Sequence, residues 1–334
     1  MVSPLPWRNK RGWPVVGLML LALLFGGCGT PAPKATPPPA STVTGERPKD
    51  LATPVPTPAL PVRPYAGPKL AGDEIIVAGQ RFHTGTRIIT WEEPAGHNAY
   101  AGTARPGLRA NQPRNDLGTL QRTVDQFVLH YDGAGLSRVC FTVLQQRKLS
   151  VHLLLDLDGT IYQTMDLQDH ATHATIANGR SIGIEMANVG AYAPAEARVL
   201  DEWYRRKRGV TTITVPPRFR STGIRTPGFT GHPARPELVR GTLAGKPLLQ
   251  YDYTPEQYAA LIKLTVALCR VFPLLRADFP HDANDRLITQ QLPEAEWKNF
   301  RGVLGHFHIQ NNKIDPGPAF QWHELIDGVR AELK

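Results

Sequence analysis

Cysteine is scarce in this sequence: only Cys28, Cys140 and Cys269 occur among its 334 residues. Three cysteines spread this widely exclude a fold held together by a disulfide framework. Long apolar runs are also scarce, and the run from Val15 to Phe25 is too short to span a bilayer permanently. Acidic residues are outnumbered, with 29 Asp and Glu against 38 Lys and Arg. A hydrophobic content of 41% nevertheless excludes a wholly disordered chain and predicts one large core.

The N-terminus has the organisation of an export signal. A basic stretch precedes the apolar run, so residues 1–27 are predicted to be a signal peptide. The end of the run, Leu24-Phe25-Gly26-Gly27-Cys28, resembles a bacterial lipoprotein signal, which implies that Cys28 is lipidated and anchors the chain to a membrane. Gly29 stands where an Asp would retain a Gram-negative lipoprotein at the inner membrane. The resemblance therefore favours the cell envelope, on the outer membrane facing the periplasm.

Proline is concentrated at and after this signal. Fifteen of the 31 prolines lie in residues 1–68, and twelve of these lie between residues 29 and 68. A segment with so many prolines and so few large apolar residues cannot bury enough surface to offset its chain entropy. Residues 28–68 are therefore predicted to form an extended, solvated tether that holds a domain away from the membrane.

The remaining chain shows regular patterns of strands and helices. Residues 69–120 are predicted to be an N-terminal extension with a β-hairpin formed by residues 74–77 and 87–91. Residues 121–334 mix buried strands with helices, which predicts a domain of the α/β (α+β) class with a central mixed β-sheet flanked by helices. The predicted strands are residues 124–130, 151–155, 160–163 and 182–187, and the predicted helices are residues 137–146, 194–206, 255–271, 293–300 and 319–332.

One stretch, residues 203–250, departs from this regularity and is predicted to be a basic surface insertion. It holds ten Lys or Arg and one acid, Glu237, whereas the rest of the chain after the signal is mildly acidic. The formal charge of +9 therefore comes from this insertion and the signal, and is not spread over the whole domain. We expect no nucleic-acid partner, because the insertion lacks an aromatic platform between its cations. Anionic lipid headgroups, acidic wall polymers and plain solvation all stay open for it.

Several histidines and one aspartate are candidate metal ligands. His130 ends a predicted buried strand, while His306 and His308 alternate on another predicted strand and are expected to face the same side. Asp315 follows in the sequence Asp315-Pro316-Gly317. Imidazoles with a carboxylate are a common ligand set for a divalent metal. A structural histidine at a strand end and a tight turn at Asp315 are equally consistent with the spacing, so both interpretations stay open.

Five segments of the sequence, taken together and in this order, carry a resemblance to a known family. Residues 127–130, 149–163, 172–174, 181–185 and 305–318 together resemble the zinc-dependent N-acetylmuramoyl-L-alanine amidases of the second amidase family, whose fold is shared with the peptidoglycan recognition proteins. The resemblance implies hydrolysis of the amide bond between N-acetylmuramic acid and L-alanine, in peptidoglycan or muropeptides, by water that a zinc ion activates. The alternative is a peptidoglycan-binding module of the same fold without hydrolytic activity.

The resemblance also implies a role for individual residues. The zinc ligands fall on His130, His306 and Asp315, a set that leaves a fourth position for water. Glu185 aligns with the catalytic glutamate, which takes a proton from water and passes it to the leaving amine. Without the resemblance, Glu185 is typical of a solvent-exposed carboxylate at a strand end. Lys313 is implied to place a cation beside the developing oxyanion.

Other positions match the family less closely. His173 corresponds to the histidine of a Trp-His-Ala motif and is implied to contact substrate, but Thr172 replaces the tryptophan. Val151 stands where some relatives carry a catalytic tyrosine, which makes the role of Glu185 more necessary. His152 is expected to be a hydrogen-bonded core histidine. The two cysteines on predicted helices, at positions 140 and 269, are expected to be buried free thiols, with a disulfide bond as the alternative.

Overall fold

A six-stranded mixed sheet is the centre of the computed structural model, which describes residues 57–103 and 105–334. The strand order is β12-β4-β7-β5-β6-β3. The first four strands of this order are parallel, β6 is antiparallel to β5, and β3 is parallel to β6. The strands are β3 (Ile88–Thr90), β4 (Gln126–Tyr131), β5 (Leu153–Leu155), β6 (Ile161–Gln163), β7 (Ser181–Met186) and β12 (Gly302–Gly305). The predicted α/β class with a central mixed sheet is confirmed.

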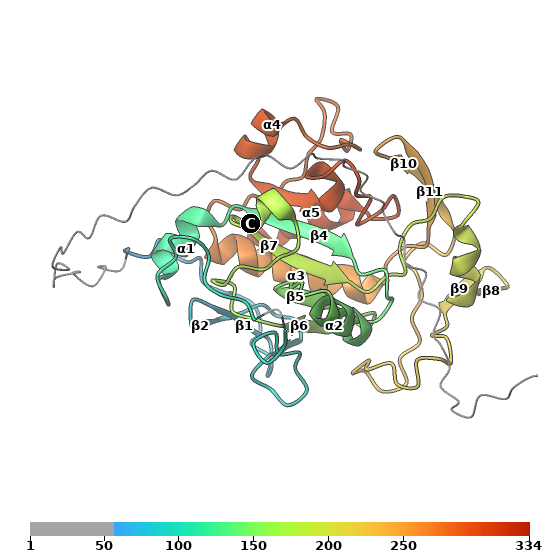
Figure 1. Cartoon of the computed structure of the whole chain (residues 1–334), viewed down its shortest axis with the longest axis horizontal. Helices are drawn as coiled ribbons and strands as arrows, with labels where there is room; N and C mark the ends of the chain where they lie inside the picture. Colours follow the sequence, from blue (N-terminus) through green and yellow to red (C-terminus); the bar gives the residue numbers. More distant parts are fainter. Residues whose placement is uncertain (1–56, 104) are drawn as a thin grey trace, which may run out of the picture. The chain divides into compact units, whose positions relative to one another are not determined.

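Helices cover both faces of this sheet (Figure 1). On one face, apolar side chains of α3 (Pro255–Val271) and α5 (Trp322–Leu333) pack against Phe127, Leu129 and Ile184 of the strands. On the other face, α2 (Ser137–Gln146) packs against Leu154 and its neighbours. The shorter helices are α1 (Leu117–Thr123), α4 (Glu294–Asn299) and the 3-10 turns Thr175–Ala177, Ala197–Glu202 and His306–His308.

Helix α3 matches its predicted range because its start is encoded locally. Pro255 occupies the first turn, where a missing N–H costs nothing. Thr254 and Gln257 form a capping box, in which each side chain accepts a hydrogen bond from the other residue's backbone N–H.

The N-terminal extension pairs differently from the prediction. Strand β1 (Glu74–Val77) forms its hairpin with β2 (Gln80–His83), and the predicted partner segment instead becomes β3 at the edge of the central sheet. Ala78 and Gly79 both have positive φ, which closes a tight two-residue turn directly after β1. The predicted extension therefore contributes a strand to the main sheet.

The chain also meets the domain earlier than predicted. The backbone N–H of Thr57 donates to Asp116 at 3.0 Å, and that of Leu60 donates to Gln121 at 2.6 Å. Residues 57–60 are thus hydrogen-bonded to buried side chains of the domain, where the sequence predicted a solvated tether through residue 68. The predicted signal peptide, Cys28 and the tether up to residue 56 lie outside the described residues.

The basic insertion contains two hairpins rather than irregular loops. They are β8 (Tyr204–Lys207) with β9 (Val210–Ile213), and β10 (Val239–Leu243) with β11 (Lys246–Gln250). The helix predicted over residues 194–206 is wrong: a short 3-10 turn is followed by β8, because Trp203 and Tyr204 turn into an apolar cluster. That cluster includes Leu136 and Ala187, which follow β4 and β7. The hairpins therefore lie at the carboxyl ends of these two strands (Figure 1).

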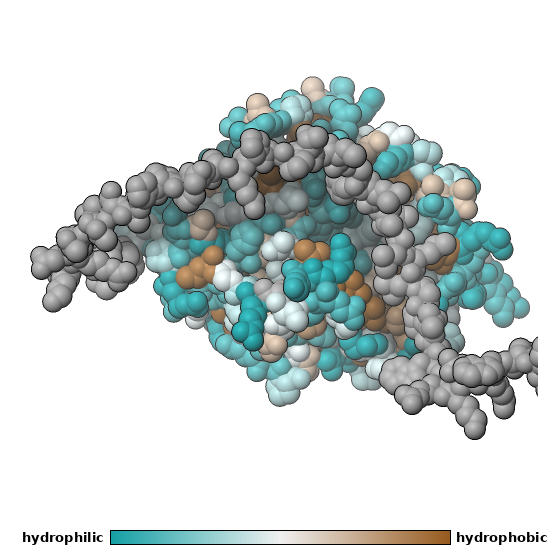
Figure 2. All heavy atoms as spheres, viewed as in Figure 1, coloured by the Kyte–Doolittle hydropathy of each residue, from teal (hydrophilic) through white to brown (hydrophobic). Residues whose placement is uncertain are grey.

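Apolar surface is divided into small patches on the face that Figure 2 shows, with polar side chains between them. Within the described ranges, no helix has the length and apolar character needed to cross a membrane. Cys140 and Cys269 are both free thiols, the first buried and the second half-buried, so the expected pair of free thiols is confirmed and the alternative disulfide is not formed.

Candidate active site

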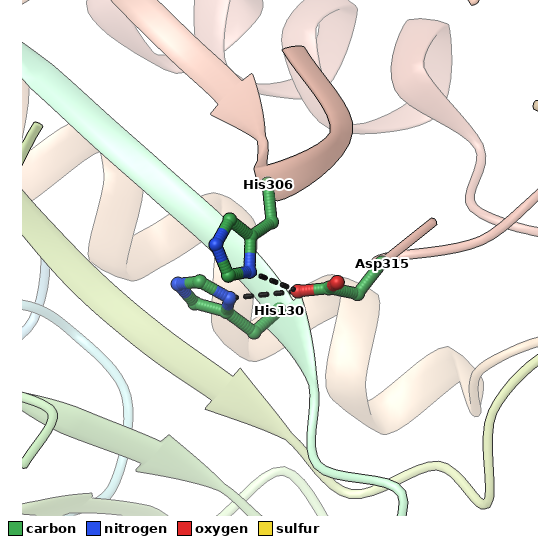
Figure 3. A group of neighbouring side chains, drawn as sticks. All are labelled: His130, His306 and Asp315. Carbon is green, nitrogen blue, oxygen red and sulfur yellow. Dashed lines mark hydrogen bonds and ion pairs between the residues drawn. The ribbon is translucent and has the colours of Figure 1, made fainter. Parts of the chain in front are cut away.

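Three predicted ligand residues converge at the carboxyl ends of β4 and β12 (Figure 3). Nδ1 of His130 lies 2.7 Å from Oδ2 of Asp315, and Nδ1 of His306 lies 3.0 Å from the same oxygen. The ligand atoms of the three residues all lie within 4.8 Å of one another. Each residue is at most 9% exposed. The fold thus brings together residues that are up to 185 positions apart in sequence.

Each of these side chains comes from a different kind of local structure. His130 is the penultimate residue of β4, and His306 begins the 3-10 turn that directly follows β12. Asp315 lies in the loop before α5, where the carbonyl of Pro316 accepts hydrogen bonds from Gln250 at 3.0 Å and Tyr253 at 2.7 Å. Because Gln250 ends β11, the basic insertion helps to hold the loop that carries Asp315.

His308 does not join this group. The sequence predicted a strand in which His306 and His308 face the same side, but β12 ends at Gly305 and the chain turns. Nδ1 of His308 accepts a hydrogen bond from the Gly305 N–H at 2.9 Å, and its Nε2 lies 2.7 Å from the Ile288 carbonyl. Both ring nitrogens are therefore occupied in the core, so His308 does not join the ligand group, and the strand predicted for His306 and His308 is wrong.

Burial and neighbouring charges shift the pKa values of His130 and Asp315. Burial lowers the pKa of His130 to about 4, with a further contribution from His306. Burial alone would raise the pKa of Asp315, but His306 and His130 hold it below its ordinary value. Nε2 of His306 lies 2.6 Å from Oε1 of Gln310, which holds the ring from the side away from Asp315. The other ring nitrogen of His306, Nδ1, faces the Asp315 carboxylate.

Glu185 lies beside His130, because the two residues are partners in the parallel register of β4 and β7. Both side chains therefore point to the same face of the sheet. Oε2 of Glu185 is buried and has no hydrogen-bond partner among the described residues. Burial raises the pKa of Glu185 well above its ordinary value, and Asp315 raises it further, while Lys313 opposes the shift. Glu185 is therefore half-buried, with one enclosed oxygen, rather than a fully solvent-exposed carboxylate.

His173 completes the group from the loop before β7. Its Nδ1 lies 3.1 Å from Nε2 of His130, and its Nε2 lies 3.2 Å from Oγ of Ser181. Burial lowers the pKa of His173 well below its ordinary value, with contributions from His130 and His152. A Cβ at Gly183 would lie 2.5 Å from Nδ1 of His173, so only glycine leaves room for this ring. No sequence signal indicates this requirement, although Gly183 lies inside one of the matching segments.

His152 is buried as predicted, and its Nδ1 accepts a hydrogen bond from the Gly183 N–H at 3.1 Å. Lys313 is half-buried near the site, where its charge lowers the pKa of both His130 and Glu185. The role of Gln310 was not predicted from the sequence. Gln310 lies four residues after His306, a spacing that brings two side chains together in a helical turn, whereas a strand was predicted at His306.

Fold and site together indicate a hydrolase with a His-His-Asp centre, and the comparison with known families is more specific. Residues 120–318 match the family described as N-acetylmuramoyl-L-alanine amidase. The match covers more than half of the chain, so the chain belongs to this family. Its reaction is hydrolysis of the amide bond between N-acetylmuramic acid and L-alanine in peptidoglycan, and the chain is therefore an enzyme of this class.

Several solved structures are similar to this chain at low identity. The N-acetylmuramoyl-L-alanine amidase LysC from Clostridium intestinale URNW is 13% identical, with 73% of this chain and 97% of that chain covered and a TM-score of 0.35. The AmpD derivative containing selenomethionine is 17% identical, with coverages of 72% and 96% and a TM-score of 0.35. The N-acetylmuramyl-L-alanine amidase AmiD from E. coli is 16% identical, with coverages of 77% and 65% and a TM-score of 0.33. No curated protein matches the chain.

Proposed function

We propose that this amidase depends on a zinc ion held by His130, His306 and Asp315. The observation that carries this proposal is the convergence of two imidazole Nδ1 atoms on one carboxylate oxygen, with Glu185 in register beside them. Two nitrogens and one oxygen are a donor set that hydrolytic zinc sites use. The Gln310 contact to the outer nitrogen of His306 is the kind of interaction that fixes the ring of a metal ligand. The residues present therefore fit zinc.

Each remaining side chain has a proposed part in the reaction. When bound, zinc supplies a Lewis acid that polarises the amide carbonyl and makes water a better nucleophile. The carboxylate of Glu185 takes a proton from the attacking water and delivers it to the leaving amine nitrogen of L-alanine, a role that its raised pKa favours. Lys313 places positive charge near the developing oxyanion. His173, held beside His130, contacts the substrate.

The substrate is proposed to be a muropeptide or the peptidoglycan polymer. The structure of AmiD is a complex with anhydro-N-acetylmuramic acid-L-Ala-D-gamma-Glu-L-Lys, a substrate of that enzyme. The family match makes the same bond the target here. His173 and Glu185 are each partly exposed.

The zinc proposal predicts about one zinc ion per folded chain, because three ligands define a single hydrolytic site. Plasma mass spectrometry of the purified full chain measures the metal content directly. Chelation is expected to abolish hydrolysis of a muropeptide, and added zinc is expected to restore it. Full activity in a chain that retains no metal after chelation would refute the zinc dependence.

We further propose that a lipid at Cys28 anchors the enzyme in the cell envelope, on the outer membrane facing the periplasm. The support is the lipoprotein-like signal and the proline-rich segment that follows it. Attachment by two or more acyl chains gives stable membrane binding, whereas a single chain gives only reversible binding. Replacing Cys28 with Ser is expected to move the chain from the membrane fraction to the soluble fraction. A variant that stays in the membrane fraction argues for another means of attachment.

A further inference from the structure

Arg109 lies in the segment before the family match and is buried, with 2% of its surface exposed. Its Nη1 donates to the carbonyl of Asn178 at 2.7 Å, and its Nη2 donates to the carbonyl of Ser181 at 2.8 Å. Nη2 also donates to the carbonyl of Leu167 at 3.2 Å. A buried cation is costly unless its donors are paired, and here backbone carbonyls of the described residues pair them.

Two of these carbonyls belong to residues that hold His173. Oδ1 of Asn178 accepts hydrogen bonds from the backbone N–H groups of His173 at 3.2 Å and Ala174 at 2.7 Å. Oγ of Ser181 lies 3.2 Å from Nε2 of His173. Arg109 therefore links Asn178, which binds the backbone of His173, to Ser181, which contacts the His173 ring.

Arg109 also contacts the core beneath the His173 ring. Its Nη2 lies 2.9 Å from Nε2 of His152, whose other nitrogen accepts the Gly183 N–H. The rings of His152 and His173 meet edge to face, with centroids 5.8 Å apart. The position of the His173 ring is thus bounded by His152, Gly183 and Ser181, and Arg109 directly contacts two of these three residues.

We propose that Arg109 is a positioning residue for His173, so that the N-terminal segment completes the active site of the family domain. This inference rests on the proposed role of His173 in contacting substrate. The guanidinium binds the carbonyls of residues 178 and 181, and the side chains of these two residues in turn hold His173 beside His130. A lysine at position 109 keeps the charge but loses the planar fork that reaches several carbonyls at once.

A double-mutant cycle on the full chain tests this inference. Arg109→Lys is expected to lower kcat/KM on a muropeptide about tenfold, because small displacements of a positioned group are costly in catalysis. In the His173→Ala background the same change is expected to have almost no effect, since the residue that Arg109 positions is already absent. Activity is expressed per zinc-loaded chain, so partial unfolding does not mimic the effect. Arg109→Gln serves as the second variant if the lysine variant does not fold.

Arg122→Lys is the matched control, because Arg122 also donates to two backbone carbonyls, those of Pro58 and Gly118, but does not touch the His173 loop. It is expected to leave kcat/KM unchanged in both backgrounds. If Arg109→Lys lowers kcat/KM equally with and without His173, the positioning role of Arg109 is wrong, while the proposed role of His173 is unaffected. An unchanged kcat/KM in His173→Ala would overturn the proposed role of His173, and the inference for Arg109 with it.

Discussion

Replacing Glu185 with Gln is expected to lower hydrolysis of a muropeptide by about 10²–10⁴-fold, the usual contribution of general acid–base catalysis. Glutamine has nearly the same shape as glutamate but cannot act as a base. Oε2 of Glu185 is buried and has no partner among the described residues, so the substitution breaks no hydrogen bond at this atom. Kinetics with a purified muropeptide, together with metal analysis, measure the effect.

The fold and the metal content are expected to survive this substitution, because Glu185 is not among the three converging ligands. Glu196→Gln, on an exposed residue outside the site, is the matched control and is expected to be fully active. If Glu185→Gln leaves turnover unchanged, the proton-transfer role is wrong. If it removes zinc as well as activity, Glu185 belongs to the metal site instead.

Replacing Asp315 with Ala is expected to abolish both zinc binding and hydrolysis. The substitution removes the oxygen on which both Nδ1 atoms converge and leaves two histidine nitrogens as the only protein donors of the described group. Two donors fall short of the three that hydrolytic zinc sites provide. Zinc content and kcat/KM of the purified full chain report the two losses separately.

Asp327→Ala is the control for this prediction, since Asp327 is an exposed aspartate on α5 whose contact with Arg330 is a surface ion pair. Such pairs contribute little to stability, so this variant is expected to keep its zinc and activity. Zinc bound at full occupancy by the Asp315→Ala chain would contradict the assignment of the ligand. Circular dichroism distinguishes loss of zinc from loss of fold.

Local signals in the sequence predicted much of the fold. The start of α3 followed from Thr254, Pro255 and Gln257, which act within one turn of each other. The position of His130 next to the end of β4 followed from a run of apolar residues that a buried parallel strand requires. The 3-10 turn after Gly305 was not predicted, because the alternation of His306 and His308 is equally compatible with a strand.

The parts of the site that could not be predicted depend on long-range contacts. Gln250 was assigned to a surface insertion, yet its amide donates to the carbonyl of Pro316, 66 residues further along the chain. Arg109 lay in a segment with no regular pattern, and its partners Asn178 and Ser181 are 69 and 72 residues away. Neither residue has a neighbour in sequence that indicates its role, so only the folded chain identifies it.

The most direct test of the account is mass spectrometry of the products from a defined muropeptide that contains the N-acetylmuramic acid–L-alanine bond. Two products are expected, an intact stem peptide that begins with a free L-alanine amine and an N-acetylmuramic acid whose lactyl group ends in a carboxylate. Both are expected to disappear after chelation and to return with added zinc. Cleavage at any other bond, or the same products from a fully metal-free chain, would contradict the account.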